Sequence, residues 1–151
     1  MPLAMLHAGL QTPAGRSLSR PVGLVCLAQA MVSSGEPAAA LRVIDEAMGM
    51  MAATGHYQHE PEFYRIRGMA LREQNDVAGS QAAFAEALRS ARHRQMKAYE
   101  LRAATDLARL WGEQGQREAA RELLAPLDGW FIEGFDTADL KKAAVLLAEL
   151  S

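Results

Sequence analysis

The segment FYRIRGMALREQNDVAGSQAAFAEAL, residues 63–88, decides the fold of this chain. On either side of Asn75-Asp76 its apolar residues return at intervals of three or four positions, which is the spacing of an amphipathic helix. Asn75-Asp76 itself is a turn signal, and Asp76 supplies a side-chain oxygen that can cap the following helix. The first predicted helix contains the small residue Gly68, and the second contains the large residue Phe84. The segment therefore predicts a closely packed helical hairpin.

The same pattern occurs three times at a spacing of 40 residues, with equivalent turns at Gly35, Asn75 and Gly115. Small residues follow each turn by five positions, and large apolar residues come four positions later. These equivalent sets are Ala40, Ser80 and Ala120, then Ile44, Phe84 and Leu124; upstream of the turns they are Leu27, Arg67 and Leu107, then Ala28, Gly68 and Ala108, then Met31, Leu71 and Trp111. A fixed period of roughly 20 to 50 residues is typical of stacked helical hairpins, which act as scaffolds for other molecules.

The turn signals divide the chain into helices and units. The predicted helices span about 22–34, 37–54, 60–74, 77–94, 96–112, 115–125 and 136–150. We expect Pro126 to kink or end the sixth helix near Ala125, because proline lacks a backbone donor. The repeat domain would occupy residues 21–151, with units near 21–60, 61–100 and 101–135 and a capping helix at 136–150. Residues 1–20 are expected to form a loop or a partly disordered N-terminal segment.

The residue types within a unit resemble the tetratricopeptide repeat, a 34-residue helix pair. In the second unit Gly68 stands for the early glycine, Asn75 for the turn glycine, Phe84 for the aromatic residue and Ala87 for the later alanine. The resemblance implies an all-α stack of about three hairpins. The longer period of 40 residues implies longer second helices or longer linkers than in that family.

Residues 100–150 carry a narrower resemblance. Four pieces are the most specific: Leu-Arg-Ala-Ala at 101–104, Leu-Ala-Arg-Leu-Trp at 107–111, Leu-Leu-Ala-Pro at 123–126, and the run from Gly-Trp-Phe to Asp-Thr-Ala-Asp-Leu at 129–140. Together they are similar to the C-terminal end of tetratricopeptide regions attached to bacterial class III adenylate or guanylate cyclases and to predicted ATPase-type regulators. The resemblance implies the regulatory or interaction end of such a signalling system. The sequence has neither a G-x-x-x-x-G-K-[ST] phosphate loop nor paired catalytic aspartates in a cyclase-like setting.

Charge and composition narrow the kinds of partner. The formal charge is −2, and residues 61–100 hold seven basic against five acidic side chains. This is far below the basic excess of a nucleic-acid footprint, so we expect neither nucleic acid nor a membrane as partner. No apolar run approaches the ~20 residues that span a bilayer, and Met1 to Leu10 lack the basic start of a signal peptide. We expect a cytoplasmic protein, with the single Cys26 buried in a helix.

Few residues point to catalysis, and we expect no enzyme, metal or cofactor. His56, His59 and Glu62 lie close together in sequence, but a metal site normally needs further ligands and a second shell. The preferred interpretation is a solvated linker. Met48, Met50 and Met51 are interpreted as core residues, with Met50 the most exposed; a pliable apolar groove is the alternative.

The candidate binding surface follows from repeat geometry. In a tetratricopeptide stack the first helices of the hairpins line a concave groove. The groove positions of that family fall in the second unit on Glu62, Arg65, Met69 and Arg72, and in the third on Arg102, Thr105, Arg109 and Gly112. Of these, the candidate partner-binding residues are Arg65, Met69, Arg72, Arg102, Thr105 and Arg109. Arginine presents a planar fork of donors suited to carboxylates. We therefore expect a protein or peptide partner with acidic side chains or a free C-terminus. The alternative is local pairing of Arg102 with Asp106 and of Arg109 with Glu113.

Two other functions stay open. The first is self-association, in which the open N-terminal hairpin or the edges of the array form a homodimer and the groove binds nothing. The aromatic turn of Trp130, Phe131 and Phe135 would add a dimer contact if it were exposed, although sealing the last hairpin is the preferred interpretation. The second and more remote function is a small metal-dependent hydrolase.

Overall fold

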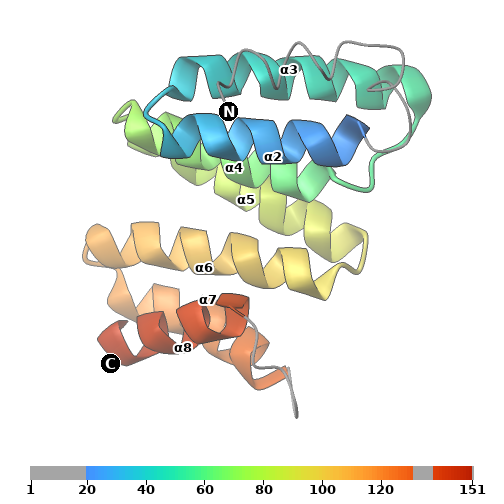
Figure 1. Ribbon diagram of the computed structural model, residues 1–151. Helices are drawn as coiled ribbons and strands as arrows, with labels where there is room; N and C mark the ends of the chain where they lie inside the picture. Colours follow the sequence, from blue (N-terminus) through green and yellow to red (C-terminus); the bar gives the residue numbers. More distant parts are fainter. Residues whose placement is uncertain (1–19, 131–137, 151) are drawn as a thin grey trace.

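The computed structural model describes residues 20–130 and 138–150, without the side chains of residues 20 and 128–130. Within these ranges the chain is entirely helical and contains no strand, which confirms the all-α prediction. The helices are α2 (Arg20–Ser33), α3 (Pro37–Thr54), α4 (Glu60–Glu73), α5 (Val77–His93), α6 (Lys97–Glu113), α7 (Arg117–Trp130) and α8 (Ala138–Leu150) (Figure 1).

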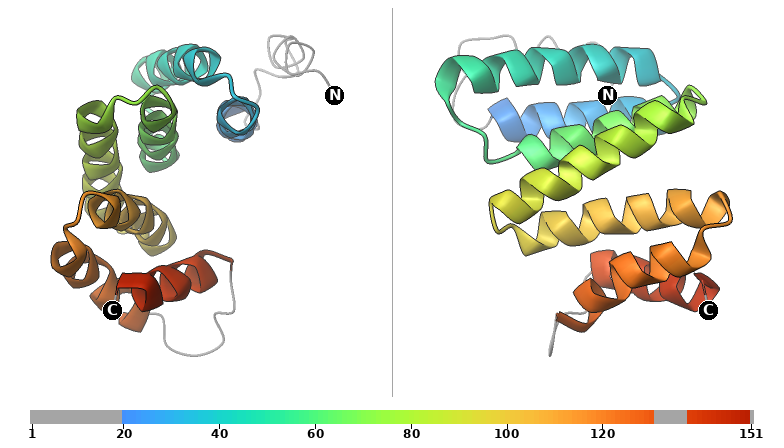
Figure 2. Two further views of the ribbon diagram at one scale, coloured as in Figure 1. Left: turned by 90° about the vertical axis from the view of Figure 1, so that its left-hand side faces the viewer. Right: turned by 180° about the vertical axis from the view of Figure 1, so that it is seen from behind.

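The helices pack in a zigzag that curves into an arc. Each helix contacts its successor, and α2, α4, α6 and α8 also contact one another in that order. The left-hand view of Figure 2 shows these four helices on the concave side of the arc and α3, α5 and α7 on the convex side. Alternate helices thus form a continuous surface, which we call the inner face.

Four helix ends share one hydrogen-bond pattern. At the first turn the amide of Gly35 donates to the carbonyl of Val32, and the amide of Glu36 donates to that of Met31. The same two bonds recur at the turns whose left-handed residues are Asn75, Gln95 and Gly115, with φ of 63°, 56° and 82°. This arrangement satisfies carbonyls at the end of a helix and reverses the chain. The sequence predicts three of these turns, and the α5–α6 connection at Gln95 is a fourth.

Gly68 allows α4 and α5 to approach closely, as the sequence predicts. A Cβ atom on Gly68 would lie 2.5 Å from the ring of Phe84, which is 1% exposed. Beside this contact the hydroxyl of Ser80 donates to the carbonyl of Gly68 at 2.7 Å. The serine at this small-residue position therefore satisfies its own polar group inside the core.

The core consists of two clusters that meet at Met69. The first is built by α2, α3 and the apolar side of α4, and the second by α5 to α8. The half-buried side chain of Met69 packs against both clusters. The hairpin from α4 to α5 is therefore the junction of the two halves.

The sixth helix differs from its prediction. Helix α7 continues four residues beyond Pro126 to Trp130. Of the two expected outcomes, a kink or an end near Ala125, the end is therefore wrong. Proline lacks the N–H that would bond the carbonyl of Glu122, but both residues are exposed, so that carbonyl lies where water can bond it.

One burial prediction is also wrong. Cys26 is exposed rather than buried, because it lies on the side of α2 away from Leu24 and Leu27.

Some predictions fall on residues that the structure does not describe. These are the N-terminal segment up to residue 19, the aromatic side chains at Trp130, Phe131 and Phe135, and the cap at Asp136 or Thr137.

Candidate functional site

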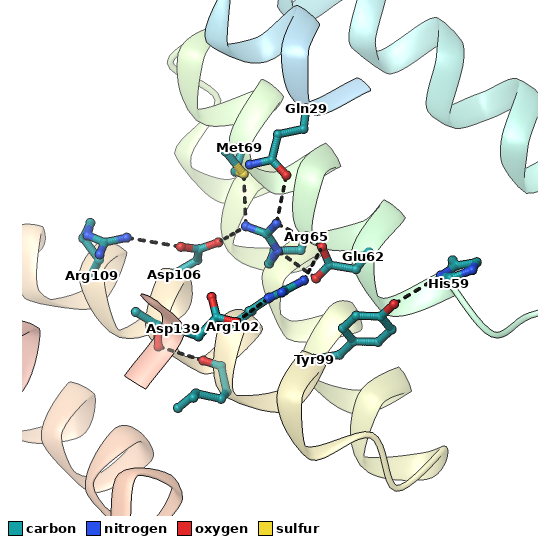
Figure 3. Close-up of polar contacts among 12 residues, drawn as sticks. Gln29, His59, Glu62, Arg65, Met69, Tyr99, Arg102, Asp106, Arg109 and Asp139 are labelled. Atoms are coloured by element: carbon teal, nitrogen blue, oxygen red, sulfur yellow. Dashed lines mark hydrogen bonds and ion pairs between the residues drawn. The ribbon is translucent and has the colours of Figure 1, made fainter. Parts of the chain in front are cut away.

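The six predicted groove residues lie on α4 and α6, which run side by side on the inner face (Figure 3). Most of their polar groups take part in a network that we call the inner-face network: Gln29 of α2, Glu62 and Arg65 of α4, Arg102, Asp106 and Arg109 of α6, and Asp139 of α8. One set of contacts therefore joins all four inner helices.

Arg65 is the centre of the network. Its Nε and Nη2 donate to the two carboxylate oxygens of Glu62, each at 3.0 Å, and its Nη1 donates to Asp106 at 3.0 Å. Further contacts reach the amide oxygen of Gln29 and the sulfur of Met69, both at 3.3 Å. Arg65 is 8% exposed and Glu62 3%. This bidentate pair is thus buried and satisfied.

The electrostatics of Arg65 follow from these contacts. Burial alone would lower its pKa, but the hydrogen bonds and charges of Glu62 and Asp106 raise the pKa well above the ordinary arginine value. The guanidinium is therefore charged at every accessible pH. Removing Glu62 would take away the bidentate partner of Arg65 and leave Asp106 as its remaining carboxylate, so the desolvated charge would be less well compensated.

Arg102 extends the network toward the end of the chain. Its Nε donates to Asp139 of α8 at 2.7 Å, and its Nη1 lies 3.4 Å from Glu62. Its guanidinium carbon lies 5.8 Å from the ring centre of Tyr99, whose hydroxyl is 3.1 Å from Nδ1 of His59. Burial and the charge of Glu62 raise the pKa of Tyr99, although Arg102 opposes this shift.

Arg72 and Arg109 are accessible to about the same degree as Arg102, whose side chain is 38% exposed. Nη1 of Arg109 donates a hydrogen bond to Asp106 at 3.1 Å, and Nη2 of Arg72 donates one to Glu113. Their side chains are 36% and 38% exposed. A guanidinium carries five N–H donors, so both residues keep donors for a partner. The hydroxyl of Thr105, in contrast, is buried and donates to the carbonyl of Leu101 in its own helix.

The arginines are paired, but not as the local alternative predicts. Arg102 bonds Asp139 and Glu62, and Arg109 bonds Asp106. Two of the ion pairs between α4 and α6, Arg65–Asp106 and Arg72–Glu113, join residues 41 positions apart, and Arg102–Glu62 is a third pair between these helices. With Asp139 of α8 included, these contacts balance four arginines with four carboxylates.

Sequence reasoning missed the interhelix pairing of the acidic residues. It considered Asp106 and Glu113 only as partners of arginines in their own helix, whereas the structure pairs them with Arg65 and Arg72 of α4. They follow these arginines by one residue more than the repeat period, and this spacing is a signal that could have identified the pairs. Asp139 of α8 was not proposed as a partner of any arginine. Its pairing with Arg102 depends on how α8 packs against α6, which the sequence pattern does not specify.

Other kinds of site have less support. Among the residues that the structure describes, no group of three or more His, Cys, Asp or Glu could hold a metal ion. Glu62, a member of the conceivable metal set, bonds Arg65 instead. No helix in the described ranges has both the length and the apolar character needed to cross a membrane.

Comparisons with known proteins do not assign the chain to a family. No protein-family model matches the sequence, and searches of curated proteins and of solved structures found no match.

Proposed function

We propose that this chain is a tetratricopeptide-like scaffold without catalytic activity, which binds a protein or peptide partner on its inner face. The observation that carries the proposal is the continuous surface of α2, α4, α6 and α8, on which partly exposed arginines are held in place by ion pairs. The repeated turns and the contacts 40 or 41 residues apart support the tetratricopeptide-like arrangement.

The ion pairs favour binding through preorganisation. A free arginine side chain loses about 0.5–1.5 kcal/mol of conformational freedom when an interface immobilises it. Arg72 and Arg102 are already oriented by carboxylates from neighbouring helices, and Arg109 by Asp106 of its own helix. A partner carboxylate would therefore meet donors that are fixed in direction. The partner that fits is a peptide with acidic side chains or a free C-terminus.

Binding can be tested with peptides selected against the purified chain. Peptides from a displayed random library would be synthesised and measured by calorimetry with the wild type and with Arg72→Ala and Arg109→Ala. Loss of a charge-assisted hydrogen bond of about 1.5–3 kcal/mol weakens binding by roughly 10- to 150-fold. Arg65→Glu is unsuitable, because Arg65 is buried in the network.

The matched control is Arg42→Ala, an exposed arginine on the convex helix α3. It should leave the affinity unchanged. Equal effects of Arg42→Ala and Arg109→Ala would contradict binding at the inner face, as would enrichment of peptides without acidic residues.

Self-association is the second candidate, since the N-terminal edge of the array presents apolar surface. Val22 of α2 is 49% exposed, and Val25 on the same helix is only half-buried. Light scattering during size-exclusion chromatography separates the two functions. The scaffold proposal expects a monomer that binds peptide, whereas a tight dimer that Val22→Glu dissociates would favour assembly.

We further propose, from the resemblance of residues 100–150, that the chain serves a bacterial signalling system in the cytoplasm.

A further inference from the structure

A cavity of about 380 Å³ opens where the first hairpin meets α4, away from the ion pairs of the inner face. It lies between the start of α2, the end of α3, the connection at residues 55–59 and the start of α4. Its volume is within the range of small-molecule sites, roughly 300–1,000 Å³. The proposed scaffold function does not use this cavity.

The interior of the cavity is apolar. Leu24 and Phe63 form its floor and are fully buried, and Met51 beside them is 5% exposed. The half-buried side chain of Met50 lines the cavity nearer to solvent. A flexible thioether adapts its shape to an apolar guest. This part of the cavity therefore suits a hydrocarbon chain.

The rim of the cavity carries hydrogen-bonding groups. Among the described residues that line the cavity, none is Lys, Arg, Asp or Glu, and the polar rim includes His56, Gln58 and His59. Nδ1 of His59 lies 3.1 Å from the hydroxyl of Tyr99, which leaves Nε2 as the second polar atom of the ring. The hydroxyl of Thr54 already donates to the carbonyl of Met50.

We propose that this cavity binds an aliphatic monocarboxylate of medium chain length. The hydrocarbon chain would lie over Leu24 and Phe63, and the carboxylate would accept hydrogen bonds from the imidazoles and the amide of the rim. A carboxylate is acceptor-only and can take several donors at once. The described residues of the lining offer no carboxylate to an ammonium head, and a sugar would bury hydroxyls against an apolar floor at a cost.

The test is calorimetry with hexanoate, octanoate, decanoate and octan-1-ol, all below micelle-forming concentrations. Each additional methylene contributes about 0.8 kcal/mol when it is buried. We therefore expect saturable 1:1 binding that strengthens about fourfold per CH₂ until the cavity is full. Octanol should bind at least tenfold more weakly than octanoate. Absence of saturable binding, or equal binding of the alcohol and the acid, overturns the proposal.

Two matched variants locate the site. Met50→Trp would fill the cavity, whereas Met48→Trp introduces the same residue at a half-buried position of α3 outside the lining. We expect octanoate affinity to fall at least tenfold in the first and less than twofold in the second, with circular dichroism confirming that both fold. A paired change of His56→Leu and Gln58→Leu should remove the preference for octanoate over octanol. Equal octanoate binding by the two tryptophan variants, or an unchanged preference in the leucine variant, contradicts the proposal.

Discussion

At the scale of single residues, the structure adds a network of hydrogen bonds and ion pairs around Arg65 to the surface that the repeat pattern predicts. Arg65 was predicted on the inner face, and the structure places it there. Its burial and its bond to Asp106 were not predictable, because they depend on how closely α6 approaches α4. The contact between Gly68 and Phe84 was predictable, because a small residue in one helix and a large residue in the next indicate which positions pack closely.

Replacing Arg65 tests the energetics of the buried pair. Arg65→Met removes the bidentate partner of the buried Glu62 and leaves it only the 3.4 Å contact with Arg102, so it should lower the free energy of unfolding in urea by up to about 3–5 kcal/mol. Adding Glu62→Leu to that variant removes the remaining buried charge and should recover part of the loss. A single variant as stable as the wild type, or a double variant no more stable than Arg65→Met, would show that the pair is not buried as described.

Gly68→Ala tests the close approach of α4 and α5. The added methyl would meet the buried ring of Phe84, and overpacking of this kind costs about 1–3 kcal/mol. Gly49→Ala is the matched control, because a Cβ at this helical position meets nothing within 4 Å. The control should gain about 0.5–1 kcal/mol from helix propensity. Thermal unfolding that ranks the two variants the other way would refute the packing assigned to Gly68.

Tyr99 gives a pH prediction. The chain has three tyrosines. Burial, together with the negative charge of Glu62, raises the pKa of Tyr99 above the ordinary value of about 10. The folded state therefore keeps this proton to higher pH than the unfolded state, so its stabilising contribution is complete below pH ~10 and declines as the pH rises above that value. An alkaline absorbance titration should lose its highest-pH component in Tyr99→Phe. Loss of a component at or below pH ~10 would contradict the shift.

At the scale of elements, the helix boundaries of the central hairpins were the most predictable feature. Helix α3 begins at Pro37 and ends at Thr54 as expected, and α5 begins at Val77 behind Asp76, whose carboxylate accepts from the amide of Gly79 at 3.0 Å. Glycine, proline and capping residues mark such ends locally. The continuation of α7 beyond Pro126 was not predictable, because the outcome depends on the solvent exposure of a carbonyl.

The α5–α6 turn yields a prediction at this scale. Gln95 adopts φ of 56°, and the left-handed conformation costs a residue with a Cβ about 1–2 kcal/mol. Gln95→Gly should therefore raise the free energy of unfolding by about 1 kcal/mol. Gln114→Gly, at φ of −87°, offers the same substitution without strain to relieve and should not stabilise. Urea denaturation that shows no gain for Gln95→Gly, or an equal gain for both, would count against the turn geometry.

At the scale of the whole molecule, the hairpins that repeat every 40 residues stack into an arc with distinct inner and outer helices (Figure 2). The sequence predicts the stacking of hairpins but not its continuity, which comes from contacts such as Arg65–Asp106, Arg72–Glu113 and Arg102–Asp139. Because these pairs balance four arginines of α4 and α6 with four carboxylates, one of them from α8, specificity for an acidic partner would rest on oriented donors rather than on a long-range field.

The most direct test of this account is an NMR titration of the isotope-labelled chain with the tightest selected acidic peptide. Binding at the inner face predicts chemical-shift changes concentrated on α4, α6 and α8, including Met69, Arg72 and Arg109, while α3 and the outer side of α5 stay unchanged. Shift changes concentrated on α3, α5 and α7, or on the exposed edge of α2 alone, would contradict an inner-face scaffold.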